Sequence, residues 1–98
     1  MNFEWDEAKN RVNIRKHGFD FADAEEMFRG ILLIRPDTRE DYGEERWIGI
    51  GMLARGTLAF VVFSEPIEGL IRIISLRRAK YAERKEYEKT IQNGLGTH

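Results

Sequence analysis

The sequence predicts an α+β fold: an antiparallel β-meander with two N-terminal helices packed on one face and a C-terminal helix. Three observations lead to this prediction. Apolar residues follow a helical spacing as far as Gly30, the pattern then changes to extended segments joined mostly by short turns, and the last segment returns to strong helix formers. With 98 residues, the chain is long enough for one hydrophobic core and too short for two domains.

The chain is expected to begin with a short edge strand at residues 3–5, followed by a helix over residues 7–16. Asp6 is a suitable N-cap for that helix, because its side chain can accept hydrogen bonds from the first free backbone N–H groups. The helical spacing places Ala8 and Val12 on the side expected to face the core.

A second helix is expected to follow directly. Gly18 can end the first helix in a left-handed conformation, and Asp20 can cap the next one. The apolar residues of this second helix share one face and are expected to be buried; they are Phe21, Ala24, Met27 and Phe28.

Four extended segments predict the strands of the meander: residues 31–34, 46–53, 58–63 and 70–76. The segment at 58–63 is apolar throughout, as expected of a central strand that is covered on both faces. Within residues 46–53, Gly49 and Gly51 share a face with Trp47 and leave room there for a bulky group, such as a helix or a ring. The connections are expected to be a charged loop at 38–45 and turns at 54–57 and 64–69.

A C-terminal helix is expected over residues 79–91. Tyr87 and Ile91 share a face, but the helix has few other apolar residues. It should therefore pack only lightly on the sheet, or become covered only when a partner binds. Residues 1–92 are therefore predicted to form a single α+β domain, and residues 93–98 a frayed tail.

Composition argues against several classes of protein. The chain has no cysteine and only two isolated histidines, so neither a disulfide framework nor a metal site is expected. No apolar run is long enough to span a membrane and the N-terminus lacks the layout of a signal peptide, which favours a cytoplasmic protein. Glycine-rich phosphate loops, serine-nucleophile motifs and zinc-binding histidine pairs are also absent, so no cofactor is expected.

Positive charge is concentrated near the C-terminus. Residues 72–98 carry seven basic and three acidic side chains, although the whole chain has a net charge of −1. If the last strand alternates to its end, Ser75 and Arg77 point to one face, and Arg72 and Arg78 point to the other.

Such a cluster suits an RNA phosphate, because guanidinium groups hold phosphate oxygens, hydroxyls donate to them and aromatic rings stack on bases. Trp47, Tyr81 and Tyr87 could supply the ring, while Lys80 and Arg84 follow one helical turn apart. An equally good explanation is ion pairing with acidic residues of the closing helix, namely Glu83, Glu86 and Glu88.

His17 stands at the C-terminal end of the first helix, beside Lys16. The helix dipole favours a cation at this end and is expected to raise the pKa of His17. A histidine in this location more often has no chemical role. It becomes a good general base only if it faces the arginine cluster, since imidazole can transfer a proton near neutral pH.

A set of short motifs is spread over residues 3–88. In chain order they are Phe3-Glu4-Trp5-Asp6, Lys9, Asn13, Lys16-His17-Gly18, Phe21, Ala24, Phe28, Gly43-Glu44-Glu45-Arg46, Arg72-Ile73-Ile74-Ser75, Arg77, Ala79, Glu83-Arg84 and Tyr87. Each motif alone is weak, but the combination is specific. Together they resemble the BrnT family, the ribonuclease toxins of bacterial type II toxin–antitoxin systems.

The resemblance implies a RelE-like α+β fold and metal-independent cleavage of RNA, without a cofactor. It also implies a BrnA-like antitoxin with a ribbon-helix-helix DNA-binding part, which neutralises the toxin and lets the complex repress its own operon. DNA would be contacted only through that antitoxin, and the toxin could be dimeric within the complex.

Cleavage of this type needs a base for the ribose 2′-OH, cations around the phosphate and an acid for the leaving oxygen. The catalytic residues that the resemblance suggests are His17, then Lys16, then Glu45 for proton transfer, and Arg46, Arg72 and Arg77 for the phosphate. Further contacts with RNA are expected from Ser75, Arg78, Lys80, Tyr81, Arg84, Tyr87 and Trp47.

The residues themselves leave a second class of function open. The same basic strand end could bind nucleic acid or a protein partner without cleaving anything. Glu65 and Glu68 make the turn at 64–69 acidic where the family often has an arginine, so RNA contact is not expected there.

Overall fold

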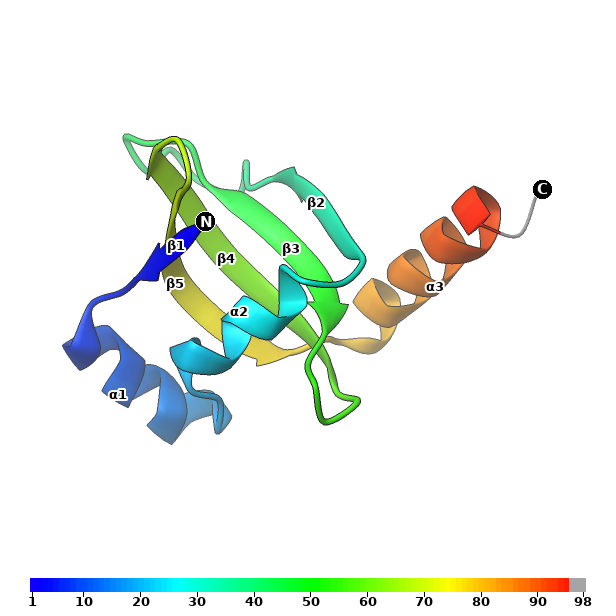
Figure 1. The fold of residues 1–98 in the computed structure, drawn as a ribbon, viewed down its shortest axis with the longest axis horizontal. Coiled ribbons are helices and arrows are strands. Elements are labelled where there is room, and N and C mark those ends of the chain that lie inside the picture. Colours follow the sequence, from blue (N-terminus) through cyan, green and yellow to red (C-terminus); the bar gives the residue numbers. More distant parts are fainter. Residues whose placement is uncertain (96–98) are drawn as a thin grey trace.

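The computed structural model describes residues 1–95, which form a five-stranded sheet with helices at both faces (Figure 1). The strand order is β1-β5-β4-β3-β2. The strands are β1 (Asn2–Glu4), β2 (Leu32–Pro36), β3 (Trp47–Met52), β4 (Leu58–Ile67) and β5 (Leu70–Arg78), and the helices are α1 (Glu7–His17), the 3₁₀ turn η1 (Phe21–Asp23), α2 (Ala24–Met27) and α3 (Tyr81–Leu95). The predicted α+β class is confirmed.

The predicted meander is confirmed for β2 to β5, because each of these strands pairs with its neighbour in the chain in antiparallel fashion. β1 adds to the free side of β5 as a parallel edge strand. The predicted turn at residues 64–69 is shorter than expected, since β4 continues to Ile67 through irregular pairing with β5. Gly69 adopts the left-handed conformation, with φ of 84°, that the remaining tight turn requires.

The second predicted helix is a 3₁₀ turn followed by a single turn of α-helix, η1 and α2. Phe21, Ala24 and Met27 are buried against one face of the sheet, as predicted, and Phe28 packs beside them. None of the buried residues of this apolar cluster comes from α1. Of the two predicted N-terminal helices, therefore, only the second, observed as η1 and α2, contributes buried residues to the core on this face.

Gly49 and Gly51 provide space on this same face of β3. A Cβ atom at Gly49 would lie 2.9 Å from Cγ1 of Val61 and 3.1 Å from Cδ1 of Leu32, and one at Gly51 would lie 3.0 Å from the same Leu32 atom. The bulky group predicted for this space is therefore the Leu32 side chain, and Met27 of α2 lies next to it.

Gly49→Ala is expected to lower the free energy of unfolding by about 1–3 kcal/mol, because the added methyl group overlaps Val61 within the closely packed sheet. Gly30→Ala is the matched control, since a Cβ atom there meets nothing within 4 Å. Urea unfolding of both variants measures the difference. Equal stabilities would show that the sheet accommodates a side chain at Gly49.

Helix α1 does not pack through its predicted apolar side. Val12 is 51 % exposed and Ala8 is exposed, whereas the buried residues of the helix are Asn10 and Asn13. The Asn13 amide nitrogen donates to the Leu76 carbonyl at 2.8 Å, and its side-chain oxygen accepts from the Leu76 N–H at 3.1 Å. Asn13 thus satisfies the backbone of β5 where β1 no longer pairs with it, and this contact requires an amide rather than an aliphatic side chain.

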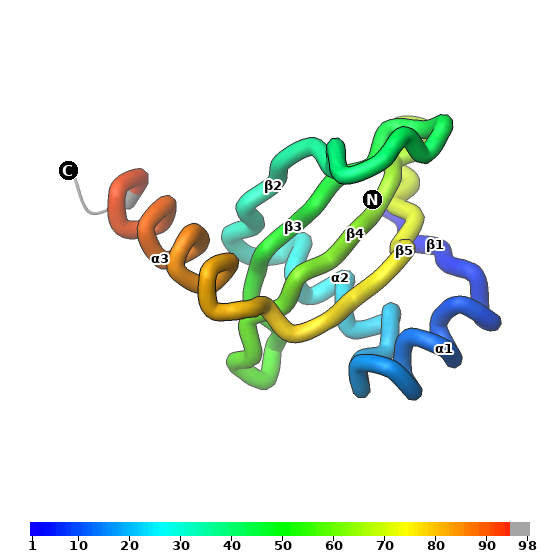
Figure 2. Tube along the Cα trace, turned by 180° about the vertical axis from the view of Figure 1, so that it is seen from behind, coloured from blue at the N-terminus to red at the C-terminus, as the bar shows by residue number. Residues whose placement is uncertain are grey.

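The face of the sheet opposite η1 and α2, the open face, is covered only in part (Figure 2). Ile48, Phe60 and Val62 form an apolar cluster there, and Tyr87 of α3 packs against this cluster. The Tyr87 hydroxyl donates to the Ile31 carbonyl at 3.0 Å, which fastens α3 to the start of β2. The rest of α3 extends away from the sheet (Figures 1 and 2).

The C-terminal helix begins two residues later than predicted, at Tyr81, and runs to Leu95. Residues 93–95 of the expected tail therefore continue the helix, and residues 96–98 lie outside the described residues. No helix within residues 1–95 combines the length and the apolarity that crossing a membrane requires.

Candidate functional site

Ser75 and Arg77 point together to the open face of the sheet, as the sequence predicts. Ser75 pairs with Val62 and Arg77 pairs with Phe60 across β4 and β5. Directly paired residues point to the same side of a sheet, and both partners belong to the apolar cluster of the open face. The hydroxyl of Ser75 and the guanidinium group of Arg77 therefore lie on a face of the sheet that no helix fully covers.

Arg77 is held firmly in place at the end of β5. Its guanidinium carbon lies 3.9 Å from the centroid of the Phe60 ring, and its two terminal nitrogens donate to the Glu83 carboxylate at 2.9 and 2.8 Å. Glu83 also accepts from the Lys80 backbone N–H at 2.8 Å, which caps the start of α3. Burial acts to raise the pKa of Glu83, but the hydrogen bonds from Arg77 and Lys80 outweigh it and the pKa is lowered.

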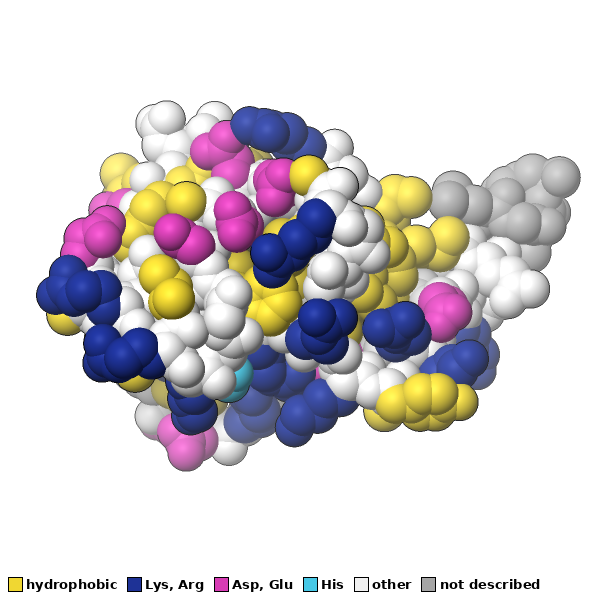
Figure 3. Space-filling model, turned by 90° about the horizontal axis from the view of Figure 1, so that it is seen from below, with side chains coloured by type: hydrophobic (Ala, Val, Ile, Leu, Met, Phe, Trp, Pro, Cys, Tyr) yellow, Lys and Arg dark blue, Asp and Glu magenta, His cyan; other side chains and the backbone are white. Residues whose placement is uncertain are grey.

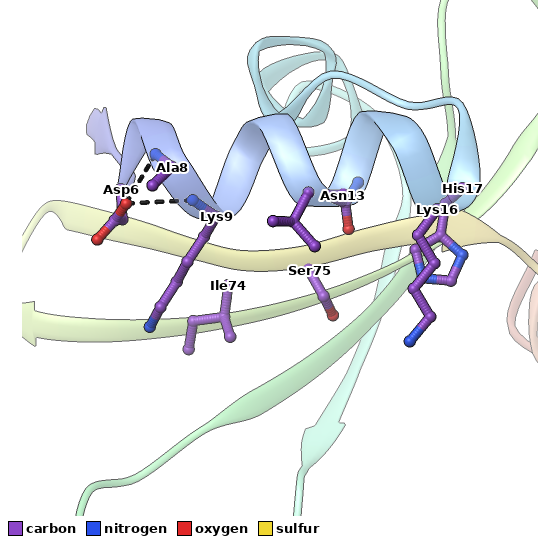
Figure 4. A pocket seen from close by; sticks show the side chains of 9 residues that line it. Asp6, Ala8, Lys9, Asn13, Lys16, His17, Ile74 and Ser75 are labelled. Atoms are coloured by element: carbon purple, nitrogen blue, oxygen red, sulfur yellow. Dashed lines mark hydrogen bonds between the residues drawn. The ribbon is translucent and has the colours of Figure 1, made fainter.

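His17 and Lys16, at the end of α1, lie beside this strand end. Both line a groove together with Ser75, and their side chains point to the same side of α1 as that hydroxyl (Figure 4). The pKa of His17 is lowered by burial and by the positive charges of Lys16 and Arg77. The predicted rise in this pKa is therefore wrong, because burial and the two neighbouring cations lower it instead. His17 lines the groove with Ser75, two residues before Arg77, and therefore lies near the arginine cluster.

Arg39 is a member of this cluster that the sequence did not suggest. It reaches from the loop between β2 and β3 until its guanidinium carbon lies 5.8 Å from the centroid of Phe60, the ring that Arg77 also covers. Two hydrogen bonds of 2.8 Å fix it to the carboxylate of Asp37, whose side chain is fully buried. The pKa of Asp37 is lowered mainly by the Arg39 hydrogen bond, which outweighs the effect of burial.

Arg46 and Arg72 occupy the other end of the open face. The Arg46 guanidinium carbon lies 4.1 Å from the centroid of the Tyr42 ring, and within residues 1–95 its Nε is buried without a hydrogen-bond partner. Arg72 Nε donates to Glu4 at 2.7 Å. The partners of Arg72 and Arg77 on β4 are Ser64 and Phe60, four positions apart, which corresponds to roughly 13 Å along the strand. Because each guanidinium group is also paired with a different carboxylate, the two are not placed to hold the same phosphate in this arrangement.

Arg72 also points to the open face, which corrects the prediction from simple alternation. Phe63 pairs with Ile73 and the preceding Val62 pairs with Ser75, so Ile74 is an extra residue in β5. This bulge shifts the alternation by one position. Arg72 and Ser75 consequently share a face instead of pointing to opposite ones.

The other predicted RNA contacts are scattered. Trp47 packs with the core on the face opposite Arg77, and Tyr87 is buried with its hydroxyl engaged. Arg84 lines a separate hollow beside α3, away from His17. The remaining predicted contacts are exposed on or near the start of α3; they are Arg78, Lys80 and Tyr81. Seen from below, several Lys and Arg side chains lie around the histidine (Figure 3).

The site thus combines a partly buried imidazole, a lysine, a hydroxyl and two guanidinium groups fixed by carboxylates. This set can accept and donate protons and can stabilise negative charge on a phosphate. Among residues 1–95, no three histidine, aspartate or glutamate side chains are placed to hold a metal ion together.

Comparisons with known proteins show the family to which the chain belongs. The family model described as the ribonuclease toxin BrnT of type II toxin–antitoxin systems matches residues 5–83. The crystal structure of the Brucella abortus ribonuclease toxin BrnT superimposes with a TM-score of 0.66 and 30% sequence identity, over 82% of this chain and 97% of that one. Among curated proteins, none matches the chain. By its family match and its structural likeness, the chain belongs to the BrnT family of ribonuclease toxins of type II toxin–antitoxin systems.

Proposed function

We propose that this chain is an endoribonuclease that cleaves RNA through attack of the ribose 2′-OH, without a metal ion. The observation that carries this proposal is the groove in which His17 and Lys16 of α1 meet Ser75 of β5, two residues before Arg77 on the same face of the sheet. A neutral imidazole next to a fixed guanidinium group suits a base that works beside a phosphate.

In the proposed reaction, His17 accepts the proton of the 2′-OH and the 2′-oxygen forms a bond with the adjacent phosphorus. The bond from phosphorus to the 5′-oxygen then breaks, and the ammonium group of Lys16, in the same groove, protonates the leaving oxygen. The products are a 2′,3′-cyclic phosphate and a 5′-hydroxyl. Glu45 lines a different hollow with Arg46, which argues against it as the base.

The two guanidinium groups at Phe60 are assigned to the phosphate whose charge increases during the reaction. Arg77 and Arg39 are each held by a carboxylate, so they need little reorganisation when charge develops. Ser75 is assigned as a hydrogen-bond donor to the same phosphate. Arg46 and Arg72, at the far end of the open face, are assigned to neighbouring phosphates along the RNA.

The family suggests an antitoxin as the partner, and we assign to it a BrnA-like ribbon-helix-helix protein that neutralises the toxin. Such a complex would repress its own operon, with DNA contacted through the antitoxin alone and with two toxin copies in the assembly. We also assign the protein to the cytoplasm and its fold to the RelE-like group.

Purified protein is expected to cleave RNA in the presence of EDTA and to leave ends with a 2′,3′-cyclic phosphate. His17→Gln should lower the cleavage rate by about 10²-fold or more, because the general base is lost. Arg29→Gln is the control and should cleave like the wild type, since Arg29 follows α2, has a 70 % exposed side chain and has no assigned contact with RNA. Intact RNA that still binds the protein would support a non-catalytic binding module instead.

A further inference from the structure

The groove that contains His17 and Ser75 continues along α1 as a surface that the proposed reaction does not use. It lies between α1 and β5 and has a volume of about 530 Å³. Beyond the catalytic groups it is lined by the aliphatic side chains of Ala8, Val12 and Ile74. Its size lies within the range of sites that hold a ligand or an inserted side chain.

Val12 has no evident role in folding. It is 51 % exposed on a helix whose buried contacts are made by Asn10 and Asn13. The same length of helix would be more soluble with a polar residue at this position, because apart from Ala8 and Ile14 the other residues of α1 are polar. What sets Val12 apart from singly exposed residues such as Ile14 is that it forms one continuous aliphatic lining with Ala8 and Ile74, a surface suited to contact with something outside the chain.

The chemistry of the groove favours a protein segment over RNA as its occupant. Nucleobases are held by aromatic rings and hydrogen bonds to their edges, whereas Ala8, Val12 and Ile74 offer only aliphatic contact. Aliphatic walls of this kind match a leucine or isoleucine side chain of a partner.

The rim of the groove is positively charged. Lys9 and Lys16 line it, and neither forms an ion pair with another residue of the described part of the chain. The nearby Asp6 accepts hydrogen bonds from the backbone N–H groups of Ala8 and Lys9, so it serves as the N-cap of α1. The basic residues of α1, against the single acidic Glu7, are Lys9, Arg11, Arg15 and Lys16. An acidic partner segment complements this rim.

We propose that the groove between α1 and β5 is the docking site for an acidic segment of the antitoxin, which inserts an aliphatic side chain between Val12 and Ile74. This inference rests on the proposed function, because it takes the antitoxin as the partner. An occupant of the groove directly adjoins His17 and Ser75 and denies RNA access to both. Neutralisation then needs no change in the conformation of the toxin.

The test compares binding of a purified BrnA-like antitoxin to the wild type and to four purified variants, by isothermal titration calorimetry. Val12→Gln is expected to weaken binding about tenfold or more, because a buried aliphatic contact is replaced by a polar group. Glutamine is a good helix former and carries no charge, so α1 and the ionisation of His17 are left undisturbed. Val12→Leu keeps the aliphatic contact and should bind like the wild type.

Ile34→Gln is the matched control, because Ile34 is 49 % exposed and lies on β2, at the opposite edge of the sheet. It should bind the antitoxin like the wild type. Lys9→Gln should weaken binding more at low salt than at high salt, because its contribution is electrostatic.

RNA cleavage by the same preparations without antitoxin separates this inference from the proposed function. Unchanged antitoxin binding by Val12→Gln would overturn the docking site. If this variant also lost RNA cleavage while it still bound the antitoxin, the groove would be assigned to RNA instead. If Val12→Gln loses antitoxin binding while even the wild type leaves RNA intact, the docking site stands and the nuclease function fails.

Discussion

Arg77→Gln is expected to lower the rate of RNA cleavage by about 10²- to 10³-fold, the usual effect of removing one fixed donor from a charged transition state. Arg77 is the cation that the structure places beside His17 and Ser75, and Glu83 holds it in one orientation. A fluorogenic RNA assay with the variant in excess over substrate measures this rate. Arg77→Lys should recover only part of the loss, because an ammonium group cannot form both hydrogen bonds to Glu83.

The same variant changes a property of His17 that does not depend on RNA. Arg77 lowers the pKa of His17, so its removal should raise that pKa toward the ordinary value of 6.5. NMR titration of the His17 ring protons in the two proteins measures the shift. A base is active when deprotonated, so the cleavage rate of a variant with residual activity should reach its plateau at a higher pH than in the wild type. An unchanged titration curve would contradict the proximity of the two side chains.

Arg72→Gln is the control for position, because the sequence assigned Arg72 and Arg77 to the same phosphate. The structure separates them by four positions of the paired strand β4, roughly 13 Å, and pairs Arg72 with Glu4. Its loss should therefore weaken RNA binding and cost about tenfold or less in cleavage at low RNA concentration. Equal losses for both variants would mean that RNA binding rearranges the strand ends.

Regular alternation made much of the sheet predictable from the sequence. The faces of β3 follow from the simple period of two, so Ile48 and Ile50 lie on one side and Trp47 and Leu53 on the other. The apolar run of β4 correctly indicated a strand covered on both faces. Periodicity succeeds in these strands because burial on a defined face is the main constraint on each residue.

The errors arose where a constraint other than face burial decided the structure. The bulge at Ile74 reverses the orientation of Arg72, and nothing in the local sequence marks an extra residue in a strand. The contact between α1 and β5 uses Asn13 to satisfy the backbone of a strand edge, so the apolar stripe of α1 was misread as its inner side. Arg39 contacts the Phe60 ring from a loop, so this contact joins the loop to the middle of the sheet. A periodic pattern describes only helices and strands and could not predict such a contact.

Arg39→Gln is expected to destabilise the protein by about 1–3 kcal/mol at neutral pH and to slow RNA cleavage at least tenfold, because it leaves the buried carboxylate of Asp37 without its main partner. Asp37→Asn removes the charge instead and frees Arg39, whose side chain is 55 % exposed and can turn to solvent. It should slow cleavage similarly but cost less stability. The double variant should be more stable than Arg39→Gln alone, since no unpaired charge remains buried.

The pH dependence of stability distinguishes these explanations. In the wild type the pKa of Asp37 lies below its ordinary value of 3.8, so the ionised carboxylate stabilises the fold above that pH, and this contribution is lost as the pH falls through the lowered pKa. Without the Arg39 side chain, burial still acts to raise the pKa of Asp37 and only the backbone N–H of residue 39 and the Tyr42 hydroxyl oppose it, so this pKa rises relative to the wild type and the ionised carboxylate stabilises the fold less. The stability difference between wild type and Arg39→Gln, measured by urea unfolding, should therefore shrink as the pH is lowered below about 4. A guanidinium group that acts on the phosphate needs the carboxylate that orients it. Full cleavage activity of Asp37→Asn would therefore show that Arg39 covers the Phe60 ring and does not act on the phosphate.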